Sequence, residues 1–314
     1  ANTLKTLLEQ YQITVSAFWC GWTGPAAWNF YDGQLTLGLV PVEYRQMRIE
    51  NLCDGADFAH RLGITDVVTH MGFIPENPYD PNFSSFCIAV RTVAEHLKKN
   101  GQCLLFETGQ ETPVTMLRCF EAVGTDNLYV NLDTANLILY GKANPADALD
   151  VFGKYVRNLH AKDGCYPTNG HELGAETPIG QGKVDFRAVF TKLHALGYNS
   201  YVTIEREIDG PQQLTDILES RTYLQNIIDL RGGSIMLKIG LVGVGGISGA
   251  HIPAWNAMED TTLTAICDIR PERMEPYPEP HHYTSIDEML EKEELDILDI
   301  CLPTYLHVPT AVKA

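Results

Sequence analysis

The sequence has little positive charge. Its 23 Lys and Arg residues stand against 40 Asp and Glu residues, which gives a net charge of −17 at pH 7. A nucleic-acid site needs clustered Lys and Arg to neutralise phosphates, and an anionic membrane surface needs the same side chains. We therefore expect no nucleic-acid partner and no membrane partner. A small substrate, neutral or metal-bound, fits the charge better.

The chain also lacks a paired cysteine motif and a long apolar run. It has eight cysteines but no C-x-x-C pair, and Cys103, Cys267 and Cys301 lie within apolar stretches. This pattern is typical of buried, reduced thiols in a cytoplasmic protein. No apolar run reaches the roughly 20 residues of a membrane-spanning helix, and ANTLKTLLEQ at the start does not resemble a signal peptide. We expect a cytoplasmic location.

The first 230 residues repeat a unit of apolar strand and amphipathic helix. The strands are short and rich in β-branched residues, as in parallel strands that are buried on both faces. They are predicted at residues 12–19, 66–70, 103–107, 128–133, 156–161 and 201–205. This repeat predicts an α/β fold, either a (β/α)8 barrel or a doubly wound sheet. No glycine-rich phosphate loop follows any of these strands, which favours the barrel.

Two long loops follow strands on the side where barrel enzymes keep their sites. Residues 20–41 follow the first strand, and residues 162–186 follow the strand that contains His160. Three of the four tryptophans, Trp19, Trp22 and Trp28, lie at the end of the first strand or in the loop after it. They are expected either to form the wall of a sugar pocket or to pack only on one another.

Polar residues end four successive predicted strands: Glu107, Asp133, His160 and Glu205. Their spacings are close to one strand–helix unit, with the long loop adding to the last. In a barrel such strand ends converge on one rim. Three carboxylates and an imidazole suit Mn²⁺, Mg²⁺, Co²⁺ or Zn²⁺ with positions open for substrate. Taken singly, each carboxylate could instead cap the next helix or pair with a cation.

The stretches ETGQETP, NLDTANLILYG, HAKDG and IERE carry a resemblance to the xylose isomerase-like barrel family. The resemblance covers residues 1–230 and implies a (β/α)8 TIM-type barrel. It also implies that the four strand-end residues hold a divalent metal and that Glu107 and Glu205 exchange a proton with the substrate. The expected reaction is isomerisation or epimerisation of a sugar, a sugar phosphate or a related polyol ketone through an ene-diolate.

Further residues are assigned to the substrate on weaker grounds. His70 and Trp19 are expected at the pocket. Lys162 is expected to contact a substrate oxygen, to stabilise negative charge, or to be a solvated loop lysine. Asn136 stands where ketose epimerases of the family have a histidine, which disfavours a ketose epimerase in the narrow sense. An inosose-type dehydratase on the same site, or a metal- or NAD-binding fragment without turnover, remain alternatives.

A second motif begins late in the chain. LKIGLVGVGGISGAH predicts a strand, a glycine-rich turn and a helix start, and a second strand ends near Asp268. Residues 237–314 resemble the nucleotide-binding domain of the glucose-fructose oxidoreductase/inositol dehydrogenase family. Asp268 would favour NAD over NADP, while Arg270 leaves NADP open. The expected cofactor-binding residues are Gly243, Gly245, Gly246, Ile247, Asp268, Pro303 and His307.

These assignments divide the chain into a barrel at 1–232, a junction at 233–236 and a Rossmann domain at 237–314. Compared with a family barrel, the chain begins at the second helix and third strand, so we expect six of eight barrel strands. The Rossmann domain is expected to be partial as well, without the family's later E-K-P lysine. A short natural regulatory tail is the alternative to a fragment of a two-enzyme fusion. An open barrel exposes strand edges and apolar surface, so we expect homo-oligomers or other self-association.

Overall fold

The computed structural model describes residues 2–232, 237–258 and 261–314, so the predicted junction at 233–236 lies outside the described residues. The chain forms two compact units, Ala1–Ile227 and Ile228–Ala314. Each unit has its own parallel sheet and its own apolar core, and each is described separately below. Among the described helices, none combines the length and the apolar character needed to cross a membrane.

The first unit is built on a sheet of six parallel strands in the order β1-β2-β3-β4-β5-β8, which confirms the prediction of a barrel-type α/β fold. Neighbours in this order are joined in parallel register throughout, for example Glu107 opposite Asn131 and Asp133 opposite His160. All strands therefore end at the same edge of the sheet. The strands are β1 (Phe18–Trp19), β2 (Asp66–Thr69), β3 (Cys103–Glu107), β4 (Leu128–Asp133), β5 (Val156–Ala161) and β8 (Val202–Ile204).

The prediction of a long first strand was wrong. Residues 12–19 were expected to be extended, but only Phe18 and Trp19 pair with another strand, opposite Val67 and Val68. A strand is defined by its hydrogen-bonded neighbour, and β1 has just one described neighbour, the four-residue β2. Apolar composition alone could not reveal how much of this segment finds a partner.

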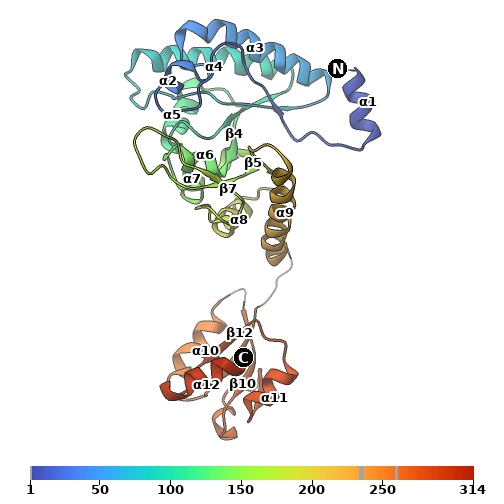
Figure 1. Ribbon diagram of the computed structural model, residues 1–314, viewed down its shortest axis with the longest axis vertical. Helices are drawn as coiled ribbons and strands as arrows, with labels where there is room; N and C mark the ends of the chain where they lie inside the picture. Colours follow the sequence, from blue (N-terminus) through green and yellow to red (C-terminus); the bar gives the residue numbers. More distant parts are fainter. Residues whose placement is uncertain (1, 233–236, 259–260) are drawn as a thin grey trace. The chain divides into compact units, whose positions relative to one another are not determined.

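Helices cover the sheet in sequence order, with α3 packed on α4, α4 on α5, α5 on α7 and α7 on α8 (Figure 1). Several begin with an aspartate, asparagine or threonine that accepts a backbone N–H, followed by proline, which is a strong start signal. Glycines 101 and 197 lie just after α4 and α8 with positive φ, as their positions in the sequence predict. The helices are α1 (Asn2–Gln10), α2 (Gly33–Thr36), α3 (Val42–Arg61), α4 (Pro81–Lys99), α5 (Pro113–Val123), α6 (Thr134–Leu139), α7 (Pro145–Phe152), α8 (Phe186–Ala195) and α9 (Pro211–Gly232).

The core of the first unit lies between the sheet and these helices. The side chains of Phe86, Phe106, Phe152 and Phe186 are at most 1% exposed. Burying one such ring contributes about 2–3 kcal/mol to stability. The core thus fixes the strands, and with them the residues at the strand ends.

The second unit has a parallel sheet in the order β11-β10-β9-β12, which fits the predicted partial Rossmann domain. The first strand of this unit, β9, is an inner strand of the sheet. The next two strands, β10 and β11, are added on one side of it, and β12 pairs with its other side. The strands are β9 (Leu237–Val242), β10 (Thr261–Cys267), β11 (His281–Tyr283) and β12 (Ile297–Ile300). The helices are α10 (Ser248–Asn256), α11 (Ile286–Lys292) and α12 (His307–Lys313).

Candidate functional site

The four predicted strand-end residues of the first unit lie together. Glu107 ends β3, Asp133 ends β4, His160 is the fifth residue of β5, and Glu205 directly follows β8. One ligand atom from each of the four lies within 4.8 Å of the corresponding atoms of the other three. The parallel register of four adjacent strands produces this cluster, because it aligns residues that are far apart in the sequence.

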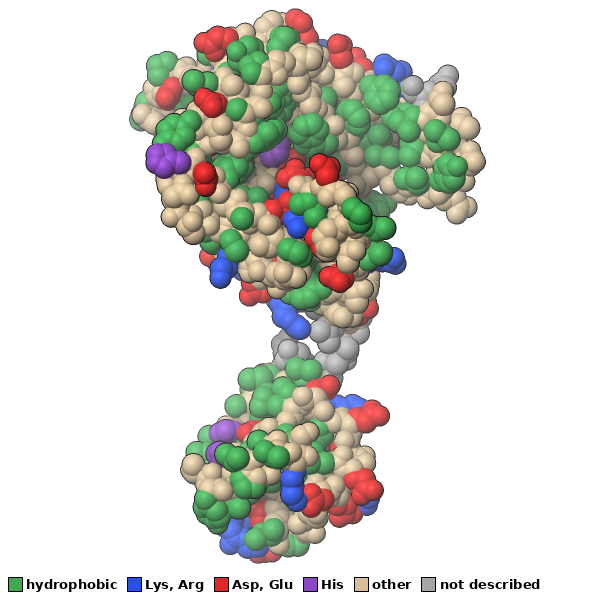
Figure 2. Space-filling view, in the orientation of Figure 1, with side chains coloured by type: hydrophobic (Ala, Val, Ile, Leu, Met, Phe, Trp, Pro, Cys, Tyr) green, Lys and Arg blue, Asp and Glu red, His purple; other side chains and the backbone are tan. Residues whose placement is uncertain are grey.

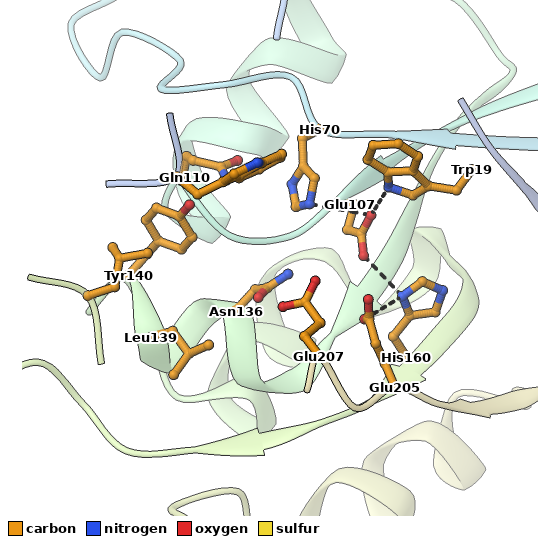
Figure 3. A pocket seen from close by; sticks show the side chains of 12 residues that line it. Trp19, His70, Glu107, Gln110, Asn136, Leu139, Tyr140, His160, Glu205 and Glu207 are labelled. Carbon is orange, nitrogen blue, oxygen red and sulfur yellow. Dashed lines mark hydrogen bonds and ion pairs between the residues drawn. The ribbon is translucent and has the colours of Figure 1, made fainter. Parts of the chain in front are cut away.

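His160 joins two of the carboxylates. Its Nδ1 lies 3.0 Å from Glu107 Oε1 and 3.0 Å from Glu205 Oε2 (Figure 3). Burial of His160 acts to lower the imidazole pKa, but the hydrogen bonds to both carboxylates outweigh it and raise the pKa to about 10. For Glu205, burial acts to raise the pKa, yet His160 and Lys162 bring it down to about 2. Without a metal, a proton on His160 therefore holds the two carboxylates together.

Asp133 caps a helix, which is one of the roles that the sequence left open. Its Oδ1 accepts the backbone N–H of Asn136 at 2.8 Å and so caps α6. Its Oδ2 is buried without a hydrogen-bond partner, and the residue is 0% exposed. Burial is the largest cause that raises the pKa of this carboxyl well above its ordinary value. The Oδ2 atom accepts no hydrogen bond from the described residues and has Lys162 Nζ at 3.8 Å. Such a carboxylate oxygen suits a divalent cation, as do the types of the four residues.

The Glu107 carboxylate is buried and held by contacts with neighbouring side chains. It is 2% exposed, and its Oε2 accepts the Nε1–H of Trp19 at 2.6 Å and lies 3.4 Å from His70 Nε2. Burial raises its pKa, but the imidazoles of His70 and His160 overcome this and leave the pKa below its ordinary value. Trp19 and His70 thus contact a catalytic candidate as well as lining the pocket, as was expected of them.

The cluster forms one side of a pocket of about 550 Å³. On this face of the first unit, Figure 2 shows a hollow where acidic, basic and histidine side chains gather. The volume lies in the range typical of small-molecule sites. The pocket is lined by Trp19, Trp28, His70, Glu107, Gln110, Asn136, Leu139, Tyr140, His160, Leu173, Glu205 and Glu207.

Lys162 is not among the residues that line the pocket, and it is not a solvated loop lysine; it lies beside carboxylates of the cluster. The side chain is 1% exposed, and its Nζ lies 2.6 Å from Glu207 Oε2. It also lies 3.8 Å from Asp133 Oδ2 and 3.9 Å from Glu205 Oε2. A lysine just past a strand end can turn either way, and the surrounding carboxylates decide the direction here.

Sequence reasoning missed Gln110, Tyr140, Leu173 and Glu207 as pocket residues. Gln110 follows Glu107 by three residues in ETGQETP, and Glu207 follows Glu205 by two in IERE, so both are close to residues that were assigned. Leu139 was missed as well; it and Tyr140 lie in NLDTANLILYG, the stretch that contains Asp133. Leu173 reaches the pocket from a loop with no comparable signal. Trp22 does not line the pocket. The centroid of its ring lies 6.3 Å from the ring centroid of Trp19 and 6.3 Å from that of Trp28.

Two long loops shape the entrance, and each is fixed by buried charge. Asp163 is 1% exposed and accepts backbone N–H groups of Gly164, Gly180, Gly182 and Val184 in the loop after β5. Tyr31 from the loop after β1 donates to or accepts from His171 in that second loop, at 2.7 Å, and their rings stack. This contact joins the two loops, which supply Trp28 and Leu173 to the pocket.

Arg48 of α3 holds the tryptophan-containing loop. It is 0% exposed and donates to the carbonyl oxygens of Thr23, Pro25 and Gly38. We expect Arg48→Lys to lower the free energy of unfolding by about 2 kcal/mol, because a lysine cannot supply three donors in a planar fork. Urea unfolding followed by tryptophan fluorescence measures this. Arg61→Lys, an exposed position on the same helix, is the control; equal stability of both variants would contradict the expectation.

His160 should make the stability of the metal-free protein depend on pH. Its folded pKa of about 10 lies above the ordinary value of 6.5, so the folded state holds the proton more tightly. The stabilisation is complete below about pH 6.5 and is lost as the pH rises toward 10. We expect the free energy of unfolding in EDTA to fall across this window. The fall should be smaller in His160→Asn and unchanged in His194→Asn, an exposed histidine on α8.

In the second unit, the predicted cofactor residues lie at the carboxyl ends of three adjacent strands. Gly243 follows β9 with φ +95°, and an added Cβ would come within 2.8 Å of the Cys301 carbonyl oxygen. Nothing lies within 4 Å of a Cβ built on Gly246, so this turn has an open side. The remaining predicted residues are Gly245 and Ile247 in the same turn, Asp268 after β10, and Pro303 and His307 after β12.

Asp268 is already bonded within the protein. Its Oδ2 accepts the backbone N–H of Val244 at 2.9 Å, and its Oδ1 accepts that of Arg270. It therefore shapes the glycine-rich turn. Because two carboxylate oxygens offer about four acceptor positions, room for a ligand hydroxyl remains.

Comparison with known proteins agrees with both units. Residues 1–227 match the xylose isomerase-like TIM barrel family, and residues 237–314 match the oxidoreductase family with an NAD-binding Rossmann fold. A xylose isomerase domain protein from Planctomyces limnophilus is 33% identical with a TM-score of 0.69, covering 72% of this chain and 82% of that one. A D-tagatose 3-epimerase-like protein is 20% identical with a TM-score of 0.56, covering 73% and 82%, which supports the fold alone.

Among curated proteins, an inosose dehydratase of Lacticaseibacillus casei is 21% identical over 185 residues, which are 49% of this chain and 61% of that protein. The chain spans 60–64% of the length of the curated relatives that it matches. The parallel strand order, the family match over residues 1–227 and the 33% identity to a solved member agree with one another. The chain belongs to the xylose isomerase-like TIM barrel family.

Proposed function

We propose that the first unit is a divalent-metal-dependent isomerase or epimerase that acts on a sugar or a related polyol ketone. One observation carries the proposal: four ligand atoms lie within 4.8 Å of one another at a pocket of about 550 Å³. Glu107, Asp133, His160 and Glu205 would hold the metal. When bound, the metal supplies a positive charge that makes the C–H next to a carbonyl more acidic.

Glu107 and Glu205 would move the proton. One carboxylate takes the proton from the carbon next to the carbonyl, and the electron pair of that C–H bond passes into the carbonyl oxygen. The same proton, or one from solvent, then returns to the neighbouring carbon or to the opposite face of the first. Trp19, His70 and His160 keep Glu107 oriented through the contacts already described. Lys162 would hold Glu207 and Glu205 in place.

Deuterium exchange tests this function. The full chain with MgCl₂ or MnCl₂ is incubated in D₂O with D-tagatose, D-fructose or myo-inosose, and the products are followed by NMR. We expect deuterium in the recovered ketose and in an isomer, with loss of exchange on adding EDTA. Absence of exchange in every ketose would reject turnover and leave a binding fragment.

A dehydratase is the second candidate, since an inosose dehydratase is among the relatives. It would use the same carboxylates to remove a proton and to protonate a departing hydroxyl group. Accumulation of a dione with loss of water would identify it, whereas isomer formation without water loss would support the first proposal.

For the second unit we propose NAD(P) binding at the glycine-rich turn. Gly243, Gly245, Gly246 and Ile247 would surround the pyrophosphate at the start of α10, where backbone N–H groups favour anions. Asp268 would contact the ribose, and Pro303 and His307 would lie beside the bound nucleotide. Titrating the full chain with NADH and with NADPH, followed by nicotinamide fluorescence, measures which one binds.

A further inference from the structure

The side chains around the pocket of the first unit offer negative charge and no permanent positive charge. The acidic residues that line it are Glu107, Glu205 and Glu207, and among the described residues lining it there is no Lys or Arg. A phosphate ester carries about −1.5 to −2 charges near neutral pH and is usually held by Arg, Lys or backbone N–H groups. A phosphorylated ligand would meet like charge here.

The nearest positive side chains are already engaged by carboxylates. Lys162 Nζ lies 2.6 Å from Glu207 Oε2, and the side chain is 1% exposed. Arg206 lies 2.9 Å from Glu176 and 2.7 Å from Asp216. Even with a divalent cation bound, the carboxylates of Glu107, Asp133, Glu205 and Glu207 exceed the charge of Lys162 and the cation by one.

The other end of the pocket has two neutral polar side chains, Gln110 and Tyr140. Their amide and hydroxyl atoms are buried and make no hydrogen bond to a third residue among those described. Burial raises the pKa of the Tyr140 hydroxyl to about 12, against its interaction with the Gln110 amide, which acts to lower this pKa. These residues are 1% and 5% exposed. Figure 3 shows the two side chains pointing toward one another at the end away from His160.

Such groups suit hydroxyls on a ligand. An unpaired buried polar group costs about 1–3 kcal/mol, which a ligand that bonds to it recovers. A sugar hydroxyl both donates and accepts, as do the Gln110 amide and the Tyr140 hydroxyl. Trp19, beside Glu107, and Trp28 also line the pocket and offer aromatic surface to the C–H groups of a polyol.

We infer that this pocket takes an uncharged, unphosphorylated polyol ketone, and that Gln110 and Tyr140 bind its hydroxyl groups at the end remote from the metal cluster. The inference rests on the proposed function, because it assumes that the reacting carbons lie beside Glu107 and Glu205. It adds the substrate class and two binding residues.

The test compares neutral ketoses with their phosphate esters on the full chain in MgCl₂. The probes are D-fructose, D-tagatose, and the 1- and 6-phosphates of each. Binding is followed by tryptophan fluorescence, since Trp19 and Trp28 line the pocket, and turnover is followed by deuterium exchange. We expect the neutral ketoses to bind and exchange at least tenfold better than the esters.

Variants test the named residues. Gln110→Met and Tyr140→Phe should weaken neutral-ketose binding about five- to tenfold without changing Mg²⁺ affinity, while the exposed-site controls Gln46→Met and Tyr79→Phe should not. Glu207→Gln removes one negative charge from the pocket, so it should reduce the ratio by which neutral ketoses bind better than their phosphate esters. Glu95→Gln, which changes the net charge equally at an exposed position on α4, should leave it unchanged.

Each outcome has one meaning. Preferential use of a phosphate ester overturns the inference and leaves the proposed isomerase intact. Unchanged neutral-ketose binding in both Gln110→Met and Tyr140→Phe overturns the assigned residues. No binding and no exchange with any probe overturns the proposed function, and the inference with it.

Discussion

Replacing Glu205 with Gln is expected to slow deuterium exchange into the ketose by about 10³-fold, within the usual range for loss of a positioned acid or base. Of the two carboxylates proposed to move the proton, Glu205 is the more accessible, with a side chain 28% exposed against 2% for Glu107. Its pKa of about 2 keeps it ionised at neutral pH. Gln keeps the shape of the side chain but cannot take up a proton.

Glu205 is also a predicted metal ligand, so the variant needs a second measurement. Mg²⁺ affinity measured by calorimetry separates weakened metal binding from lost proton transfer, and exchange is compared at saturating Mg²⁺. Glu95→Gln on the exposed face of α4 serves as the control. If Glu205→Gln exchanges at the wild-type rate when saturated with Mg²⁺, the carboxylate does not carry the proton.

Asp133→Asn should weaken metal binding without destabilising the metal-free fold. The asparagine Oδ1 can still accept the Asn136 N–H that caps α6, so the local structure is kept. It cannot supply a negative charge to a cation, so Mg²⁺ affinity is expected to fall at least 10²-fold. The metal-free variant should be at least as stable as wild type, because burial already disfavours the charged form of Asp133.

Thermal unfolding with EDTA and with MgCl₂ measures both effects. Wild type should gain stability on adding Mg²⁺, and Asp133→Asn should not gain it. Asp54→Asn, on α3 and away from the cluster, should respond to Mg²⁺ as wild type does. A variant that retains the full Mg²⁺ response would remove Asp133 from the proposed ligand set.

The sequence alone was sufficient for the fold class and for most strand positions. Periodicity placed β3, β4 and β5 at their observed bounds. β3 and β4 are buried at nearly every residue, so their sequences are largely apolar. β5 also contains exposed and polar residues, and only its second half is mostly buried. The sequence was also sufficient for the four polar strand-end residues. A charged group directly after an apolar run is conspicuous, and parallel strands make their ends coincide.

Tertiary structure alone decided which groups share hydrogen bonds and which meet the pocket. Trp19 contacts Glu107 across 88 residues, and the Lys162 ammonium group contacts Glu207 across 45. Leu173 reaches the pocket from a loop that shows no local pattern. The length of β1 likewise depended on how much partner strand was available. The periodicity of the sequence indicates which residues are buried. The direction in which a side chain points, and the group that it bonds to, depend on other side chains that the fold brings close, often from distant parts of the chain.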